Sequence, residues 1–222
     1  MSSPSTTSTL IARIPYLNTE PFYHRFSAQG YELIDLPPRA LGQAAAAGRV
    51  AAGPMSVMDY FRLQDTFEPL GPFGICAAGP VHSVLLFGRK SLQELNGDTI
   101  GITEETSTSV VLLRLLLERY YQVTPAAWRG NLEEPADARL LIGDPCLRHA
   151  AEGTEPVILD LSAAWYEWQK KPFVFALWVV RRDLPLEEKK VLAMRFEDAF
   201  FEGMAHLNEI AERRAPDLGM TP

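Results

Sequence analysis

The chain has 222 residues, of which 47% are hydrophobic and 22% charged, as in an ordinary globular protein. This composition excludes a disordered chain, a collagen-like chain and a disulfide scaffold. Its 21 basic and 28 acidic residues give a formal net charge of −7, which repels phosphate backbones and argues against nucleic acid as a partner.

Short apolar runs alternate with helical patterns along the chain, which predicts an α/β protein with mixed, mainly parallel sheets flanked by helices. The run at 50–52 is expected to stop at Gly53-Pro54, because glycine and proline interrupt strands. The run at 173–180 is apolar throughout and predicts a strand buried on both faces. Strands are expected at 10–14, 31–36, 50–52, 73–77, 83–87, 99–102, 140–143, 157–161 and 173–180. Helices are expected through 22–26, at 39–47, from 57, at 110–121, from 144 and at 185–213.

Two segments, 84–90 and 172–179, are candidates for crossovers between two lobes. We expect lobe I to comprise residues 1–87 and 176–222, and lobe II residues 88–175. Much of the glycine and proline falls at strand ends, where a cleft between lobes would need turns. Clefts at such interfaces are preferred sites for small ligands.

Polar residues gather at the turns between strands and helices. Each group has a plain alternative as a helix cap or a turn. The hydroxyls of 107–109 open a helix, whose free N–H groups could bind an anion, although Glu104 and Glu105 would repel it unless they point away. The candidate residues are Tyr16, Asn18, Ser56, His82, Ser83, Ser107, Thr108, Ser109, Gly143 and Asp144.

Cys76 and Cys146 are far apart and show no CxxC spacing, so we expect two buried free thiols in a reducing compartment. The four histidines have no metal-binding spacing, so no metal site is expected. The first nine residues lack the features of a secretory signal, and no apolar run could span a bilayer. These features predict a cytoplasmic protein.

Six segments follow one another along the chain: YLNTEPF, GPMSVMDYF, GPVHSVLLFGR, ETSTSVVLLRLLL, LLIGDP and KPFVFALWVVRR. In this order they resemble the chorismate dehydratase family of the futalosine route to menaquinone. The resemblance implies a two-lobed, periplasmic-binding-protein-like type II fold, conversion of chorismate to 3-[(1-carboxyvinyl)oxy]benzoate and water, and no cofactor. Departures from the family pattern are Ala51, Lys170-Lys171 and a C-terminus that looks short.

The same resemblance implies roles for the candidate residues. Asn18 and Ser83 would be catalytic and hold the substrate near its reacting carbons. No matched residue is a good general base at neutral pH, so we expect a carboxylate of chorismate to take the ring proton, with His82 as the alternative base. Carboxylate binding is expected from Ser56, Ser107, Thr108 and Ser109, the far wall of the cleft from Gly143 and Asp144, and further substrate contacts from Tyr16 and His82.

Three other interpretations stay open. The chain could be a non-catalytic receptor for a small carboxylate, a ligand-sensing domain of a regulator, or a diverged enzyme for another cyclohexadiene or aromatic acid. A small-molecule partner is common to all of them. The sequence leaves the oligomeric state open, with monomer and homodimer as alternatives.

Overall fold

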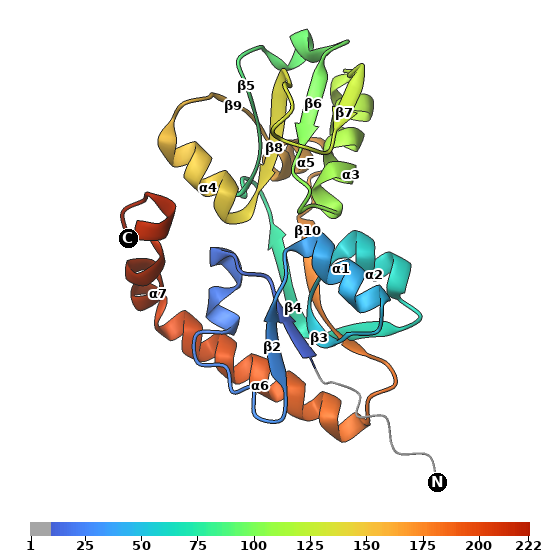
Figure 1. Cartoon of the computed structure of the whole chain (residues 1–222), viewed down its shortest axis with the longest axis vertical. Helices are drawn as coiled ribbons and strands as arrows, with labels where there is room; N and C mark the ends of the chain where they lie inside the picture. Colours follow the sequence, from blue (N-terminus) through green and yellow to red (C-terminus); the bar gives the residue numbers. More distant parts are fainter. Residues whose placement is uncertain (1–9) are drawn as a thin grey trace.

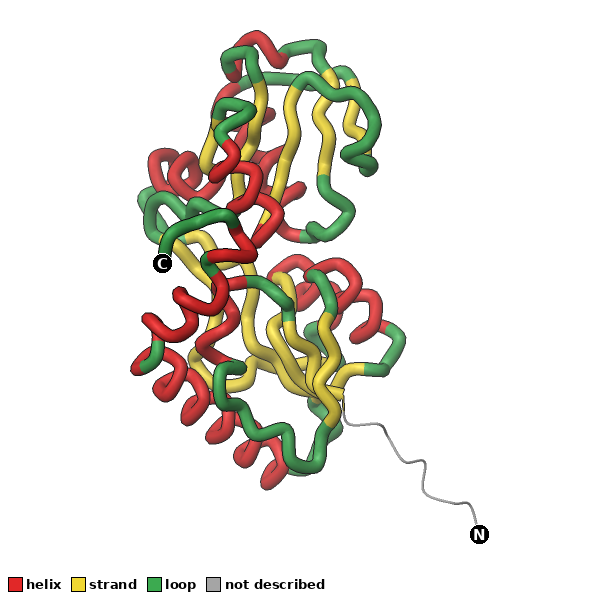
Figure 2. The backbone as a smooth tube through the Cα atoms, turned by 60° about the vertical axis from the view of Figure 1, so that its left-hand side comes forward, coloured by secondary structure: helices red, strands yellow, loops and turns green. Residues whose placement is uncertain are grey.

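The computed structural model describes residues 10–222. The expectation that no secretory signal precedes the first strand therefore lies outside the described residues. Two five-stranded sheets lie one beyond the other along the long axis of the molecule, each with its own helices (Figure 1). Figure 2 shows the strands of the two sheets as an upper and a lower group, with the chain passing between them in the middle of the molecule.

The first sheet has the strand order β2-β1-β3-β10-β4. β1 runs parallel to β2 and β3, whereas β10 runs antiparallel to β3 and β4. Helices α1 and α2 pack on one face, and α6 covers the other (Figure 1). The strands are β1 (Leu10–Arg13), β2 (Glu32–Asp35), β3 (Val50–Ser56), β4 (Phe67–Ala77) and β10 (Phe173–Arg181). The helices are η1 (Leu17–Phe22), α1 (Pro38–Ala46), α2 (Val57–Leu63), α6 (Leu186–Ala205), α7 (Leu207–Arg214) and η4 (Pro216–Leu218).

The second sheet has the order β7-β6-β8-β5-β9. Its strands are β5 (Val84–Gly88), β6 (Thr99–Ile102), β7 (Ala127–Arg129), β8 (Ala138–Ile142) and β9 (Val157–Asp160). Its helices are η2 (Leu92–Leu95), α3 (Thr108–Leu115), η3 (Leu116–Tyr121), α4 (Gly143–Glu152) and α5 (Leu161–Gln169). The expected α/β class with mixed sheets is confirmed, but parallel and antiparallel pairings are equally frequent, four of each, rather than mainly parallel.

Strand β10 has the two-faced burial that its apolar sequence predicts. Trp178 and Val180 face the core beneath α6, and Phe175 and Val179 face the core beneath α1. From Phe175 to Val180 the strand is covered on both faces, and this explains the absence of hydrophobic alternation there, whereas Val174 near its start is exposed.

Strand β3 does not end at Gly53-Pro54 as expected. It continues to Ser56, and Pro54 lies opposite Trp178 of β10. Gly53 adopts φ +150°, and a Cβ there would lie 2.4 Å from the Ala12 carbonyl oxygen of neighbouring β1. The glycine thus permits a close approach of two strands within the sheet.

The C-terminal segment was expected to form one helix and forms two, which meet at His206. Helix α6 packs closely on η1, because a Cβ at Gly203 would lie 2.0 Å from the Pro21 carbonyl oxygen. The segment that follows the last strand therefore supports η1, which carries Asn18.

The expected lobe limits, residues 1–87 with 176–222 and residues 88–175, stay a prediction. By hydrogen bonding β5 belongs to the second sheet and all of β10 to the first. The segments predicted as crossovers, 84–90 and 172–179, thus contain strands β5 and β10. The chain passes from one sheet to the other just before each of these strands.

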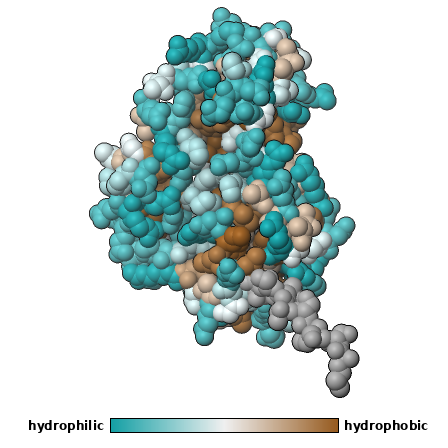
Figure 3. Space-filling view, in the orientation of Figure 1, coloured by the Kyte–Doolittle hydropathy of each residue, from teal (hydrophilic) through white to brown (hydrophobic). Residues whose placement is uncertain are grey.

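The face drawn in Figure 3 is mostly hydrophilic, and hydrophobic residues gather in a patch below the middle of the view. Within residues 10–222, no helix combines the length and apolarity that crossing a membrane requires. Cys146 is buried as expected, but Cys76 is exposed, so the prediction of two buried thiols is wrong for Cys76.

Candidate functional site

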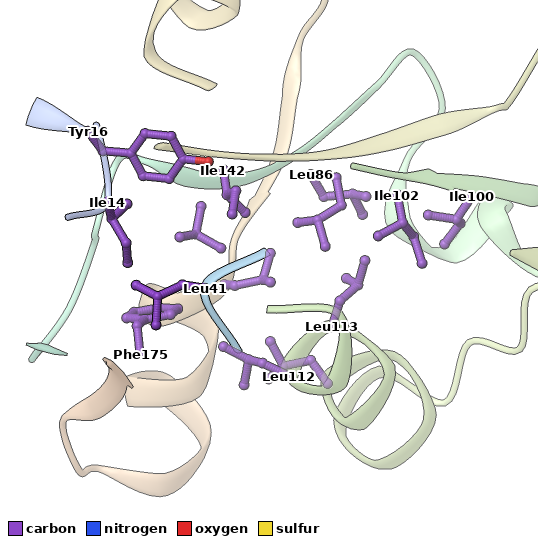
Figure 4. Packing of buried hydrophobic residues seen from close by; sticks show 14 of the residues in the cluster. Ile14, Tyr16, Leu41, Leu86, Ile100, Ile102, Leu112, Leu113, Ile142 and Phe175 are labelled. Carbon is purple, nitrogen blue, oxygen red and sulfur yellow. The ribbon is translucent and has the colours of Figure 1, made fainter. Parts of the chain in front are cut away.

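A cavity lies where strand ends of the two sheets meet. Clefts between lobes are preferred sites for small ligands. Its apolar wall includes Ile14, Ile142 and Phe175; these belong to the buried cluster drawn in Figure 4, in which the Tyr16 hydroxyl is directed toward Ile142. Eight of the ten predicted site residues line the cavity, namely Tyr16, Asn18, Ser56, Ser83, Ser107, Thr108, Ser109 and Gly143.

Tyr16 connects the two sheets across this cavity. It follows β1 of the first sheet, and its hydroxyl donates to Glu105 Oε2 at 2.5 Å after β6 of the second. Burial, with the hydrogen bond to Glu105 as the next cause, raises the pKa of Tyr16 well above its ordinary value. The phenol therefore stays neutral, and the Glu105 carboxylate is turned toward Tyr16 rather than into the start of α3.

Gly143, at the start of α4, packs against the ring of Tyr16. It has φ +60°, and a Cβ there would lie 2.4 Å from the ring carbons of Tyr16. The ring thus packs directly on the backbone at the start of α4, which a side chain would prevent. This close approach positions the wall of the cavity relative to β1.

The start of α3 presents hydroxyl groups to the cavity, as predicted. Thr106 supplies the cap, since its Oγ1 accepts from the Ser109 N–H at 3.1 Å, while Ser107 at the N-cap position makes no capping hydrogen bond. Thr108 Oγ1 accepts from the Met58 N–H of α2 at 3.2 Å. The proton of this hydroxyl is therefore free to donate to a ligand.

Ser56 lines the cavity but is already engaged. Its Oγ accepts from the Asp59 N–H at 3.2 Å, which confirms the predicted helix cap, and donates to Asp59 Oδ2 at 2.7 Å. A ligand carboxylate could receive this proton only if Ser56 turned away from Asp59. Its role in carboxylate binding stays a prediction, with this competing bond in place.

Asn18 and Ser83 lie together at the mouth of the cavity. Both also line an adjoining hollow that contains Phe73 and Cys76. Ser83 Oγ has one weak contact, 3.4 Å to the Val81 carbonyl oxygen. Asn18 is exposed, and its amide makes no hydrogen bond to the described part of the chain. Both side chains can therefore reach a ligand that enters from this side.

His82 does not line the cavity, although it was predicted to contact substrate. Its φ of +60° and the hydrogen bonds of the Val81 and His82 N–H groups to Asp160 Oδ2, at 2.9 and 2.8 Å, direct this turn outward. His82 lines a separate hollow with Leu147 and Val157. This placement also argues against His82 as the base.

Asp144 lies behind the cavity wall rather than on it. Its Oδ1 accepts from the Leu17 N–H at 2.7 Å, and its Oδ2 accepts from Arg214 at 2.5 Å. Burial raises its pKa above the ordinary value, against the lowering influence of the Leu17 N–H and the Arg214 charge. Asp144 therefore holds η1 against α4 and does not line the cavity.

A family model described as menaquinone biosynthesis matches residues 9–221. The chain belongs to this family. It is 32% identical over 225 residues to a chorismate dehydratase from Thermus thermophilus, across 93% of this chain and 82% of that protein. The resemblance carried by the six sequence segments is thus confirmed.

Solved structures show the fold of this family member. A protein from Archaeoglobus fulgidus superimposes with a TM-score of 0.77 at 19% identity, over 94% of this chain and 81% of the other. The periplasmic aliphatic sulphonate-binding protein of Escherichia coli gives 0.63 at 14% identity, over 96% and 79%. The expected periplasmic-binding-protein-like fold is confirmed.

Two residues near the site of this family member were missed by sequence reasoning. Glu105 was considered only as a source of repulsion, whereas it accepts the Tyr16 hydroxyl. Arg214 carried no signal, because its partners Glu20 and Asp144 lie 194 and 70 positions away in the chain. In the described part of the chain, no group of three or more His, Cys, Asp or Glu side chains could hold a metal ion.

Proposed function

We propose that this member of the menaquinone-biosynthesis family is a lyase that converts chorismate to 3-[(1-carboxyvinyl)oxy]benzoate and water. The observation that carries the proposal is the 32% identity to a chorismate dehydratase over 93% of the chain. A cavity with apolar walls and hydroxyl groups, between two sheets, supports it. The proposal places the reaction in the cytoplasm and assigns it no cofactor.

The structure of chorismate explains why the enzyme needs few catalytic groups. Chorismate is a cyclohexadiene with two carboxylates, a ring hydroxyl and an enolpyruvyl ether. Loss of the hydroxyl and of the proton on the neighbouring ether-bearing carbon makes the ring aromatic, so the reaction is strongly favourable. The enzyme has to supply orientation, a base and stabilisation of developing charge.

The start of α3 is the proposed site for the ring carboxylate. The Thr108 hydroxyl has a proton to donate, and Ser107 and Ser109 lie beside it. Helix N-terminal N–H groups attract anions, and the helical turns continue through η3 to Tyr121. Charge that develops in the ring during proton removal extends into this carboxylate, where these donors stabilise it.

The lining of the cavity supports a base supplied by the substrate. Among its described lining residues Tyr16 is the one titratable side chain, and its proton is directed to Glu105. We therefore assign proton removal to the enolpyruvyl carboxylate of chorismate, which Asn18 holds in place. The ring hydroxyl then leaves with a proton as water, and Ser83 contacts the substrate near the reacting carbons.

The test is the rate of chorismate consumption by the wild type and by Asn18→Ala. Loss of one oriented hydrogen-bonding group costs about 100-fold in kcat, the scale of a lost oxyanion-type donor. Asn131→Ala, in a surface loop after β7, is the matched control and keeps the wild-type rate. Full activity of Asn18→Ala would contradict this assignment, and binding of chorismate without turnover by the wild type would favour a non-catalytic carboxylate receptor.

A further inference from the structure

A buried ion cluster joins the end of the chain to both halves of the site. Glu20 of η1 is 8% exposed and Asp144 of α4 is 4% exposed. Arg214, the last residue of α7, reaches both carboxylates. Helix α7 lies between α6 and α4 in Figure 1, and it packs against η1.

The guanidinium of Arg214 bridges two elements with two different nitrogens. One nitrogen donates to Glu20 Oε1, and the other donates to Asp144 Oδ2 at 2.5 Å. The second oxygen of Asp144 accepts from the Leu17 N–H at 2.7 Å. Leu17 and Glu20 flank Asn18 within the six-residue η1, so the backbone of Asn18 is held from both sides.

The bridge also continues to the wall of the cavity. Asp144 follows Gly143, against which the Tyr16 ring packs. The Arg214 guanidinium therefore bridges two buried carboxylates and ties the turn after β1 to the start of α4, while Arg213 also pairs with Glu20. Without Arg214, the negative charges of Glu20 and Asp144 would remain close together at buried positions with only Arg213 to offset the charge of Glu20. An uncompensated charge at a buried position is costly.

We propose that Arg214 is a positioning residue for the dehydration, which fixes the orientation of Asn18 and the distance between η1 and α4 by bridging Glu20 and Asp144. This inference rests on the proposed function. It assigns a role in the active site to a helix that contributes no residue to the cavity lining. A displacement of about 1 Å in a reacting geometry can cost 100-fold in rate, which is the scale of effect expected here.

The neighbouring arginine provides the matched control. Arg213 donates to Glu20 Oε2 at 2.8 Å, but its side chain is half exposed and makes no contact with Asp144. Arg213→Gln removes a positive charge from the same helix turn without breaking the bridge. Arg214→Lys keeps the charge but offers a single ammonium, which cannot reproduce the planar two-nitrogen fork.

The experiment measures kcat and KM for chorismate with purified full-length variants, together with their thermal unfolding. Arg214→Gln is expected to lower kcat by about 30- to 100-fold, Arg214→Lys to give an intermediate rate, and Arg213→Gln to stay within about threefold of the wild type. Asp144→Asn keeps an acceptor for the Leu17 N–H, so its effect and that of Arg214→Gln on kcat should not be additive.

A second comparison separates positioning from a purely structural role. In an Asn18→Ala background, Arg214→Gln should lower kcat by a smaller factor than in the wild-type background, because the part of its effect that passes through Asn18 is already lost. An equal loss in both backgrounds, or a fall in unfolding temperature with kcat unchanged, would overturn the inference. An inactive wild type would remove the proposed function and this inference together, whereas an active wild type with an equally active Arg214→Gln would remove the inference alone.

Discussion

Substitution of Gly143 by alanine tests the contact between the two sheets. The residue has φ +60°, and the added Cβ would lie 2.4 Å from the Tyr16 ring. A carbon–carbon contact needs about 3.5–4.0 Å, so the ring would have to move by more than about 1 Å. Such a shift would break the 2.5 Å hydrogen bond from the Tyr16 hydroxyl to Glu105.

Two separate effects lower the free energy of unfolding of Gly143→Ala. The left-handed conformation costs alanine about 1–2 kcal/mol. Loss of a hydrogen bond to a charged group costs about 1.5–3 kcal/mol. The free energy of unfolding should therefore fall by about 2.5–5 kcal/mol, and kcat/KM should fall as well because the cavity wall moves.

Gly153→Ala is the control for backbone strain alone. Gly153 ends α4 with φ +62°, and an added Cβ there meets no atom within 4 Å. Urea denaturation of the two variants should show a loss for Gly153→Ala of only about 1–2 kcal/mol, with wild-type kcat/KM. Equal losses in the two variants would refute the argument that the packing of Tyr16 on Gly143 stabilises the contact between the two sheets.

Two further variants or treatments follow from burial and packing. A thiol reagent should modify exposed Cys76 in the native protein but not Cys146, whose burial raises its pKa to about 12. The label should slow turnover, because Cys76 lines the hollow that adjoins the cavity beside Asn18 and Ser83, and equal reactivity of the two thiols would contradict this. Gly203→Ala should lower the free energy of unfolding by about 1–3 kcal/mol, since its Cβ would lie 2.0 Å from the Pro21 carbonyl oxygen, and wild-type stability in urea would show that α6 does not press on η1.

Local pattern predicted much of the fold. The alternation of apolar runs with helical patterns predicted most strands, and the continuous run at 173–180 predicted a central strand, because both depend on which side of an element is buried. The strand predicted at 50–52 was too short, because the sequence alone interprets Gly53-Pro54 as a break. The glycine is instead required by the close approach of Ala12, which is a tertiary contact. The equal share of antiparallel pairs likewise depends on topology rather than on any one segment.

The sequence predicted the position of some site residues correctly and of others wrongly. Residues at strand ends, such as Asn18, Ser83 and Thr108, meet at one cavity because strand ends of both sheets face it. His82 and Asp144 occupy adjacent positions in the same motifs but point elsewhere, as hydrogen bonds to Asp160 and Arg214 direct them. Neighbouring residues in a turn need not share a direction, and no local pattern specifies these distant partners.

The most direct test of the central claim is to incubate the purified chain with chorismate and identify the product by nuclear magnetic resonance and mass spectrometry. The account predicts an aromatic product that has lost one water and keeps its enolpyruvyl ether, formed catalytically and without an added cofactor. Chorismate that is recovered unchanged, or an aromatic product that has lost the enolpyruvyl group, would contradict the account.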